Sequence, residues 1–150
     1  MTQRNVTNEE LAELIRHTAE AASAYMRGDI HRYLMLIQHA DDYTLMSPYG
    51  GKPTHGFDAS PERLEATARY FQAGEANLEL VQSYMAGDMV VLVVIERQHG
   101  EVGGLPDQDW SLRVTLVFRR DECEWRLVHR HADPLVHGIS LEQLSALARG

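Results

Sequence analysis

The chain has 150 residues, with 14 Lys and Arg against 22 Asp and Glu, and a formal net charge of −8. That length suits one domain spanning residues 1–150 with a sizeable core. The acidic balance argues against a nucleic-acid binder. No apolar run reaches the roughly 18 residues of a membrane helix. The N-terminus has no apolar signal segment and Cys123 is the only cysteine, so we expect a cytoplasmic protein.

The first quarter of the chain is predicted to be helical. Thr7 and Glu10 have the spacing of a capping box, which predicts a helix start at this point. Apolar residues then recur at helical spacing up to Gly28, which favours a helix stop. Asp29 is predicted to cap a second, shorter helix that runs to about His39.

A short strand and a third helix are predicted next. The segment YTLMSPYGG, residues 43–51, is typical of a short strand that ends in a Pro/Gly turn. Within DASPERLEATARYF, Ser60 is a suitable N-cap and Pro61 suits the first helical position.

The second half of the chain has the pattern of long strands. Four segments are rich in Val, Leu and aromatic residues: ANLELVQSYM, MVVLVVIERQH, DWSLRVTLVFRR and EWRLVHRHA. Short turns join the first to the second and the third to the fourth, which predicts two antiparallel hairpins. A terminal helix capped by Ser140 is expected to follow. Helices followed by a strand meander predict an α+β fold in which a curved sheet and the helices enclose a cavity.

Three segments resemble the nuclear transport factor 2-like superfamily. GDIHRYLMLIQHADDYTLMSPYGGKPTHG is similar to its helix–strand–turn segment, and RVTLVFRRDECEW is similar to its penultimate strand and hairpin. WRLVHRHAD resembles the last strand of many SnoaL-like members. The resemblance covers nearly the whole chain and implies a cone-like α+β domain, with a curved, mostly antiparallel sheet wrapped around the N-terminal helices. The superfamily includes ketosteroid isomerases, SnoaL-like polyketide cyclases and the association domain of calmodulin-dependent kinase II, so the fold alone does not fix the function.

Departures from the isomerase pattern narrow the implied activity. Where ketosteroid isomerases keep an aspartate base before the turn proline, this chain has Ser47. The matching positions of their oxyanion hole fall near Ala21 and near Thr115 or Leu116. A serine needs its own activating base to transfer a proton, so the resemblance does not extend to classical steroid isomerisation.

Polar residues on the last strand are candidates for acid–base chemistry. Strand alternation places His129, His131 and Asp133 on one face and Arg130 on the other. Asp133 is placed to fix the tautomer of His129 or His131, which would shuttle a proton on a bound carbonyl or hydroxyl compound. Glu96, at the end of an apolar strand, is an alternative base because burial raises the pKa of a carboxyl group. The candidate catalytic residues are therefore His129, Asp133 and Glu96.

Other residues are candidates for ligand binding. Arg113 is suited to hold a carboxylate or an enolate-like oxygen by a bidentate contact. The resemblance to the association domain implies an anion-binding or assembly role for Arg113 and, less directly, Arg97. By analogy with the superfamily, Tyr49 and His55 are expected to flank the pocket mouth and orient a substrate, and His131 is a further candidate for ligand binding. We expect a small hydrophobic or carboxylate-bearing ligand and an isomerase, cyclase or hydrolase reaction without a cofactor.

Alternative hypotheses remain open at this point. His129, Arg113 and Glu96 can instead form a network that supports the sheet without turnover, in a ligand-binding or oligomerisation module. A metal site would use His129, His131 and Asp133 with His137 or His55, but an H-x-H pattern is a weak signal and no metal is expected. The pattern leaves open which face of the sheet turns inward. If the outer face is apolar, a second subunit would cover it and the protein would be a homodimer.

Overall fold

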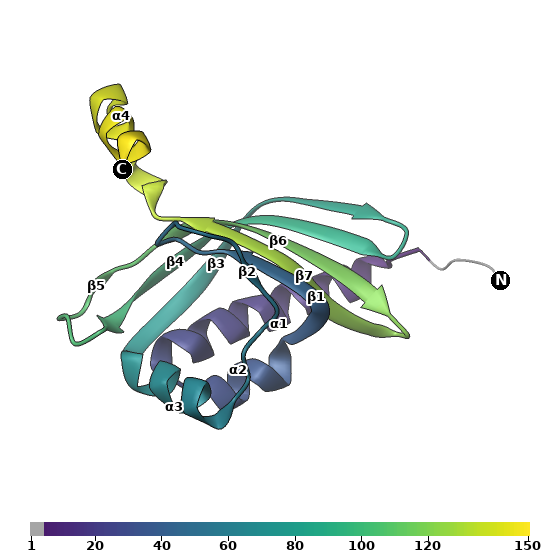
Figure 1. Ribbon diagram of the computed structural model, residues 1–150. Coiled ribbons are helices and arrows are strands. Elements are labelled where there is room, and N and C mark those ends of the chain that lie inside the picture. Colours follow the sequence, from purple (N-terminus) through teal and green to yellow (C-terminus); the bar gives the residue numbers. More distant parts are fainter. Residues whose placement is uncertain (1–4) are drawn as a thin grey trace.

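The computed structural model describes residues 5–150, and Figure 1 shows a curved sheet with three helices on one side. The three helices are α1 (Asn8–Arg27), α2 (Ile30–Leu36) and α3 (Pro61–Tyr70). A fourth helix, α4 (Leu141–Arg149), stands apart from them (Figure 1). Within the described residues, no helix is both long and apolar enough to cross a membrane.

The sheet has seven strands and is mostly antiparallel. Its order is β2-β1-β7-β6-β4-β3, with β5 paired to β4. Within the described part of the chain, β1 and β7 pair in parallel, and the other neighbours are antiparallel. The strands are β1 (Gln38–Met46), β2 (Thr54–His55), β3 (Phe71–Ala86), β4 (Met89–Val102), β5 (Gln108–Asp109), β6 (Leu112–Asp121) and β7 (Glu124–Asp133). The predicted α+β fold, with its two long hairpins, is confirmed.

Local sequence sets the helix ends, as predicted. The Thr7 hydroxyl accepts the backbone N–H of Glu10 at 3.1 Å, and the Glu10 carboxylate accepts the N–H of Thr7 at 3.3 Å. Ser60 caps α3, and Ser140 caps α4. Gly28 ends α1 in the left-handed conformation, with φ +81°. These caps satisfy backbone groups that would otherwise lack partners.

The second helix is shorter than predicted. It ends at Leu36 instead of His39, and Ile37 is already extended. The chain changes direction because Gln38 and His39 pair in parallel with β7. The gain from adding a strand to the sheet thus outweighs the local helix pattern. Strand β1 consequently starts earlier than the predicted segment 43–51 and ends at Met46.

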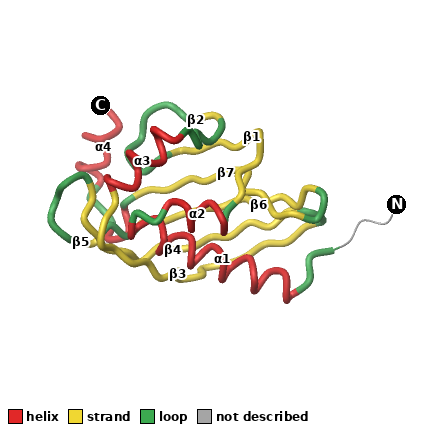
Figure 2. The backbone as a smooth tube through the Cα atoms, turned by 90° about the horizontal axis from the view of Figure 1, so that it is seen from below, coloured by secondary structure: helices red, strands yellow, loops and turns green. Residues whose placement is uncertain are grey.

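The hydrophobic core lies between the concave face of the sheet and α1. Inward residues of β4 and β6 alternate with partly exposed ones, as a half-buried strand requires. Buried residues on these two strands are Val90, Leu92, Val94, Val114, Leu116 and Phe118, and α1 contributes Leu14 and Ala21. The apolar set of the third predicted strand therefore faces the helices. Figure 2, which views the molecule from the helix side, shows α1 and α2 lying across the sheet.

Candidate functional site

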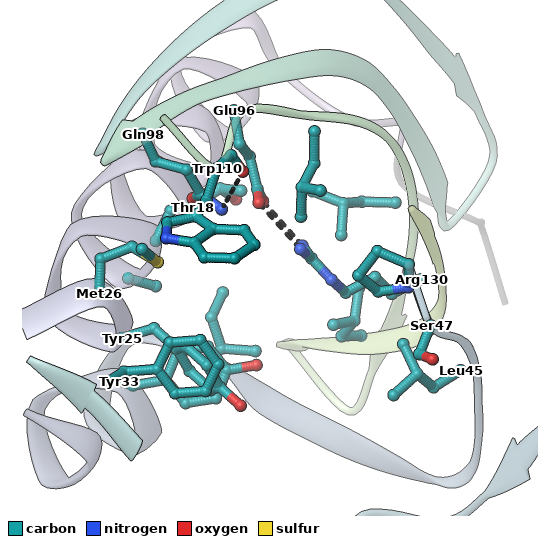
Figure 3. Close-up of a pocket in the computed structure, with 18 of the residues that line it drawn as sticks. Thr18, Tyr25, Met26, Tyr33, Leu45, Ser47, Glu96, Gln98, Trp110 and Arg130 are labelled. Atoms are coloured by element: carbon teal, nitrogen blue, oxygen red, sulfur yellow. Dashed lines mark hydrogen bonds and ion pairs between the residues drawn. The ribbon is translucent and has the colours of Figure 1, made fainter. Parts of the chain in front are cut away.

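A cavity of about 350 Å³ lies between the concave sheet face and the helices (Figure 3). Most of its wall is apolar or aromatic. Residues of this kind include Met26, Phe57, Phe71, Leu112, Phe118 and Leu127. Tyr49, which is 75% exposed, contributes to the open end. A concave apolar site with a few polar groups is the usual form of a small-molecule pocket.

The main polar feature of the cavity wall is an ion pair between Glu96 on β4 and Arg130 on β7. Arg130 Nη1 donates to Glu96 Oε2 at 2.7 Å, and Nη2 donates to Oε1 at 2.8 Å. Glu96 is 3% exposed. Burial alone would lower the pKa of Arg130, but the charge and hydrogen bonds of Glu96 outweigh burial and raise it. Arg130 therefore remains a cation inside the cavity.

A β-bulge places Arg130 on the inner face of the sheet. Strict alternation would put Leu127 and Arg130 on opposite faces, because they are three residues apart. In the structure, Leu127 pairs with Phe118 and His129 with Val117, so one extra residue of β7 lies between them. Such a bulge re-aims the side chains that follow it. Both Leu127 and Arg130 consequently line the cavity.

Several other polar groups of the wall make hydrogen bonds within the chain. The Thr18 hydroxyl donates to the Leu14 carbonyl at 2.7 Å. Gln98 Nε2 donates to the Trp110 carbonyl, and the Trp110 indole N–H donates to the Gly100 carbonyl, both at 3.1 Å. These bonds fix the shape of the wall.

Arg130 keeps donors that its ion pair does not use. Its two bonds to Glu96 employ one N–H of each terminal nitrogen, which leaves Nε–H and the adjacent Nη–H as a second donor edge. Among residues 5–150, every fully buried side-chain nitrogen and oxygen has a hydrogen-bond partner, whereas Arg130 Nε has none, so Nε is not fully buried. The Nε edge is therefore accessible from the cavity. Figure 3 shows Tyr25 and Tyr33 on the side of the cavity opposite Arg130.

Three aromatic residues of the same wall, Tyr33, Tyr43 and Phe57, pack around His39, which does not itself line the cavity. The His39 ring stacks on Phe57, with centroids 3.8 Å apart, and packs edge-on against Tyr43. His39 Nε2 lies 3.0 Å from the Tyr33 hydroxyl. Burial, reinforced by the charge of Arg130, lowers the pKa of His39 to about 4. Burial also raises the pKa of Tyr43 to about 12 and that of Tyr33 further. All three groups are therefore neutral at neutral pH.

Two of the predicted site residues line the cavity. Glu96 lies on its wall and Tyr49 at its open end. The predicted partners of Glu96 do not join it. Arg130, which sequence analysis placed on the opposite face from the candidate histidines, takes that position instead. The sequence signal for Arg130 was a cation on a strand face that alternation otherwise fills with the apolar residues Val128 and Ala132.

The histidines and Asp133 of the last strand face the other way. They share one face, as alternation predicted, but that face is the convex one, because the apolar faces of β4 and β6 turn inward. His129 Nδ1 lies 2.8 Å from the Thr44 hydroxyl, and the His129 and His131 rings are 6.5 Å apart. Asp133 instead binds Arg113 through two bonds of 2.9 and 3.0 Å. The expectation that His129 and Asp133 line the cavity therefore differs from the structure.

The remaining predicted ligand-binding residues are also outside the cavity lining. Arg97 Nη2 donates to Glu79 Oε2 at 3.4 Å on the exposed surface. His55 is exposed on β2. Hydrogen bonds from Arg113 lower the pKa of Asp133. Among the described residues, no group of three or more His, Cys, Asp or Glu side chains is arranged to hold a metal ion.

Comparison with known proteins places the chain in a family. The model of the SnoaL-like domain family matches residues 15–136. No curated protein sequence matches the chain. A proposed dehydratase of the NTF2-like family from Streptomyces avermitilis has a TM-score of 0.65 at 21% identity, over 85% of this chain and 95% of that chain.

Other solved structures share the fold with different functions. A proposed aromatic ring hydroxylase from Novosphingobium aromaticivorans has a TM-score of 0.63 at 19% identity, over 84% of this chain and 87% of that chain. The association domain of CaMKII from C. elegans has a TM-score of 0.61 at 13% identity, over 83% of this chain and 95% of that chain. Identities this low establish the fold alone. The family match spans most of the chain, and the protein belongs to the SnoaL-like domain family.

Proposed function

We propose that the cavity binds a neutral, mostly apolar compound that carries an oxygen able to accept hydrogen bonds. The observation that carries this proposal is the buried Glu96–Arg130 pair on an otherwise apolar wall. The free edge of Arg130 is the natural donor to a ketone, ester or phenol oxygen. The apolar walls favour the rest of the ligand by the hydrophobic effect.

Charge balance favours a neutral ligand over a carboxylate. Glu96 already neutralises Arg130, so a bound carboxylate would leave a net negative charge in a site of low dielectric. A carbonyl oxygen accepts the same hydrogen bonds without adding charge. The carboxylate-bearing ligand expected from the sequence remains the alternative that the binding experiment below compares.

The same pair can support acid–base chemistry. A carboxylate oxygen has lone pairs beyond those that accept from Arg130, so Glu96 can take a proton from a carbon next to the bound carbonyl. Arg130 would stabilise the negative charge that develops on the carbonyl oxygen. Isomerase, cyclase or hydrolase chemistry of this type needs no cofactor. The proposed dehydratase and hydroxylase among the structural neighbours fit an enzymatic role.

The binding experiment compares aryl ketones with aryl carboxylates of the same size by isothermal titration calorimetry. Arg130→Lys keeps the charge opposite Glu96 but removes the second donor edge. We expect the ketones to bind more tightly, and Arg130→Lys to weaken them about tenfold. Arg113→Lys, on the convex face, is the matched control and leaves binding unchanged. Binding that depends on Arg113 and ignores Arg130 would refute the proposal.

A catalytic role and a binding role differ in the response to Glu96→Gln. The amide keeps nearly the same shape but is no longer a base. An enzyme would retain ligand affinity and lose turnover of the bound ketone, as followed by exchange of its α-hydrogen in D₂O. A non-catalytic binding module shows no exchange above the buffer rate in either form.

We also propose that the convex face of the sheet joins two copies of the chain. Outward residues of β3, β4 and β6 form a mostly apolar strip, termed here the outer face: Tyr84, Val91, Val93, Ile95, Thr115 and Val117. Arginines around this strip are paired within the chain, as in Arg113–Asp133 and Arg119–Asp42. An apolar centre with a polar rim is the usual anatomy of a protein interface. The structural similarity to a CaMKII association domain supports assembly of several copies. The cytoplasmic location expected from the sequence stays a prediction.

A further inference from the structure

The C-terminal helix α4 is an amphipathic element that the rest of its own chain does not cover. None of its residues is buried. Leu141, Leu144 and Leu147 are 76%, 49% and 65% exposed, and they recur every three residues along one side. Ile139, just before the helix, is 38% exposed. The capping box at Ser140 stabilises the start of this helix.

A helix of this length needs a packing partner. Isolated helices shorter than about 12–15 residues are marginal in water, because helix nucleation is costly. Helix α4 has nine residues, so its caps alone do not make it stable. Its apolar side therefore indicates a surface on which it packs.

The position of α4 separates it from the cavity. Figure 1 shows α4 beyond the end of β7, on the side of the sheet opposite to α1, α2 and α3. The connection is a single-turn helix, Leu135–His137, followed by Gly138 at φ +76° and ψ 161°. This conformation is essentially restricted to glycine. The path that it sets directs α4 away from the helices that cover the cavity.

We propose that α4 of one subunit packs on a second copy of the chain, beside the outer face. This inference rests on the homodimer proposed above. Two sheets that pack through their convex faces bring each α4, which projects on that side, towards the partner subunit. The charges of α4 are few and balanced, with Glu142 in its first turn and Arg149 in its last. They therefore fit a site beside the outer face, where Arg113 and Arg119 are already paired with Asp133 and Asp42.

The size of the convex side of the sheet supports the same occupant. Around the outer face, five adjacent strands, about 4.8 Å apart and each about eight residues long, give a footprint of roughly 500 Å². Stable interfaces bury about 800 Å² on each partner. The footprint of a nine-residue helix is roughly 140 Å², from a length of about 14 Å and a diameter of about 10 Å. In a symmetric dimer this contribution counts twice for each subunit, once for its own α4 and once for the α4 that it receives.

The test measures dimerisation of the full chain by analytical ultracentrifugation. The triple variant Leu141→Ser, Leu144→Ser, Leu147→Ser removes the apolar side of α4. We expect the dimer dissociation constant to rise about 100-fold or more, because buried leucines at an interface contribute strongly. Ala146→Ser, on the opposite side of α4, is the matched control and leaves the dimer unchanged.

The possible outcomes separate the two proposals. A full-length chain that stays monomeric at millimolar concentration overturns both the homodimer and the docking of α4. A dimer that the triple variant does not weaken overturns the docking of α4 alone.

Hydrogen exchange identifies what covers the helix. Under the proposal, amides of residues 141–150 are protected in the dimer and lose protection when the sample is diluted below the dissociation constant. Protection that persists in the monomer would show that α4 packs on its own domain, and exchange without protection at any concentration would show that it packs on nothing. Either result overturns the inference.

Discussion

Glu96 and Arg130 form a two-bond ion pair across an intervening strand. Glu96 on β4 lies beside Leu112 of β6, whereas Arg130 on β7 lies beside Leu116 of the same strand. Arg130 therefore reaches diagonally over β6 to make its bonds of 2.7 and 2.8 Å. The pair links three strands on the face that lines the cavity and places a charge pair next to any bound ligand.

Removal of one member of this pair should destabilise the fold more than replacement of both. Arg130→Met leaves the Glu96 carboxylate buried without its partner, and we expect a loss of about 3–5 kcal/mol. The double variant Glu96→Leu, Arg130→Met removes both charges and should recover most of that loss. Urea unfolding at pH 7 measures both changes. Arg113→Met, which breaks the exposed Arg113–Asp133 pair, is the comparison. If Arg130→Met is no less stable than Arg113→Met, the Glu96–Arg130 pair does not stabilise the sheet as a unit.

The partly buried His39 should make stability fall in mild acid. Its pKa is about 4 in the fold, against 6.5 as the ordinary value, so below pH 6.5 the unfolded chain binds a proton that the fold excludes. The stability is complete above about pH 6.5 and falls as the pH approaches 4, by up to about 3 kcal/mol.

Urea unfolding at pH 7 and pH 4.5 measures this loss, and His39→Gln serves as the comparison. Glutamine offers a hydrogen-bonding partner to the Tyr33 hydroxyl but does not titrate. The variant should therefore lose less stability between the two pH values. An equal loss in both proteins would assign the acid sensitivity to other groups.

Local signals predicted the elements, since the residues that set them are neighbours in the sequence. The caps at Thr7, Ser60 and Ser140 need only residues three positions away. The apolar alternation of β4 and β6 likewise predicted two strands of the hairpins. The end of α2 was predicted too late, because pairing of Gln38 with the distant β7 is not encoded locally.

The site was harder to predict because it depends on sheet register. Glu96 was identified as a polar residue at the end of an apolar strand. Arg130 was missed, although it pairs with the buried Leu116, because that register and the bulge before His129 arise only when β6 and β7 come together. The same missing information left open which face turned inward, so the convex histidines remained candidates for the cavity.

The close approach at Gly28 should make this position intolerant of any side chain. A Cβ at Gly28 would lie 2.3 Å from the Phe71 carbonyl oxygen and 2.6 Å from that of Ala68. Its φ of +81° adds strain for other residues. We expect Gly28→Ala to cost about 3 kcal/mol or more. Gly104→Ala has a similar φ of +83° but meets no atom within 4 Å, so it isolates the contribution of strain. Thermal unfolding measures the loss of stability in both variants, and equal losses would contradict a role for the close contacts at Gly28.

A charge at the centre of the outer face should dissociate the proposed homodimer while the fold remains intact. Val93 lies on the convex side of β4, opposite Thr115 of β6, and is only partly exposed in the single chain. In a dimer, Val93→Lys would bury an ammonium group without a partner, and such a charge is strongly unfavourable. In the monomer the lysine can extend into water. We therefore expect a shift from dimer to monomer in light scattering with an unchanged circular dichroism spectrum. Ala66→Lys, on the exposed surface of α3, adds the same charge away from the sheet and should leave the dimer intact. A Val93→Lys protein that remains dimeric would exclude the outer face as the interface and would direct attention to other surfaces of the domain.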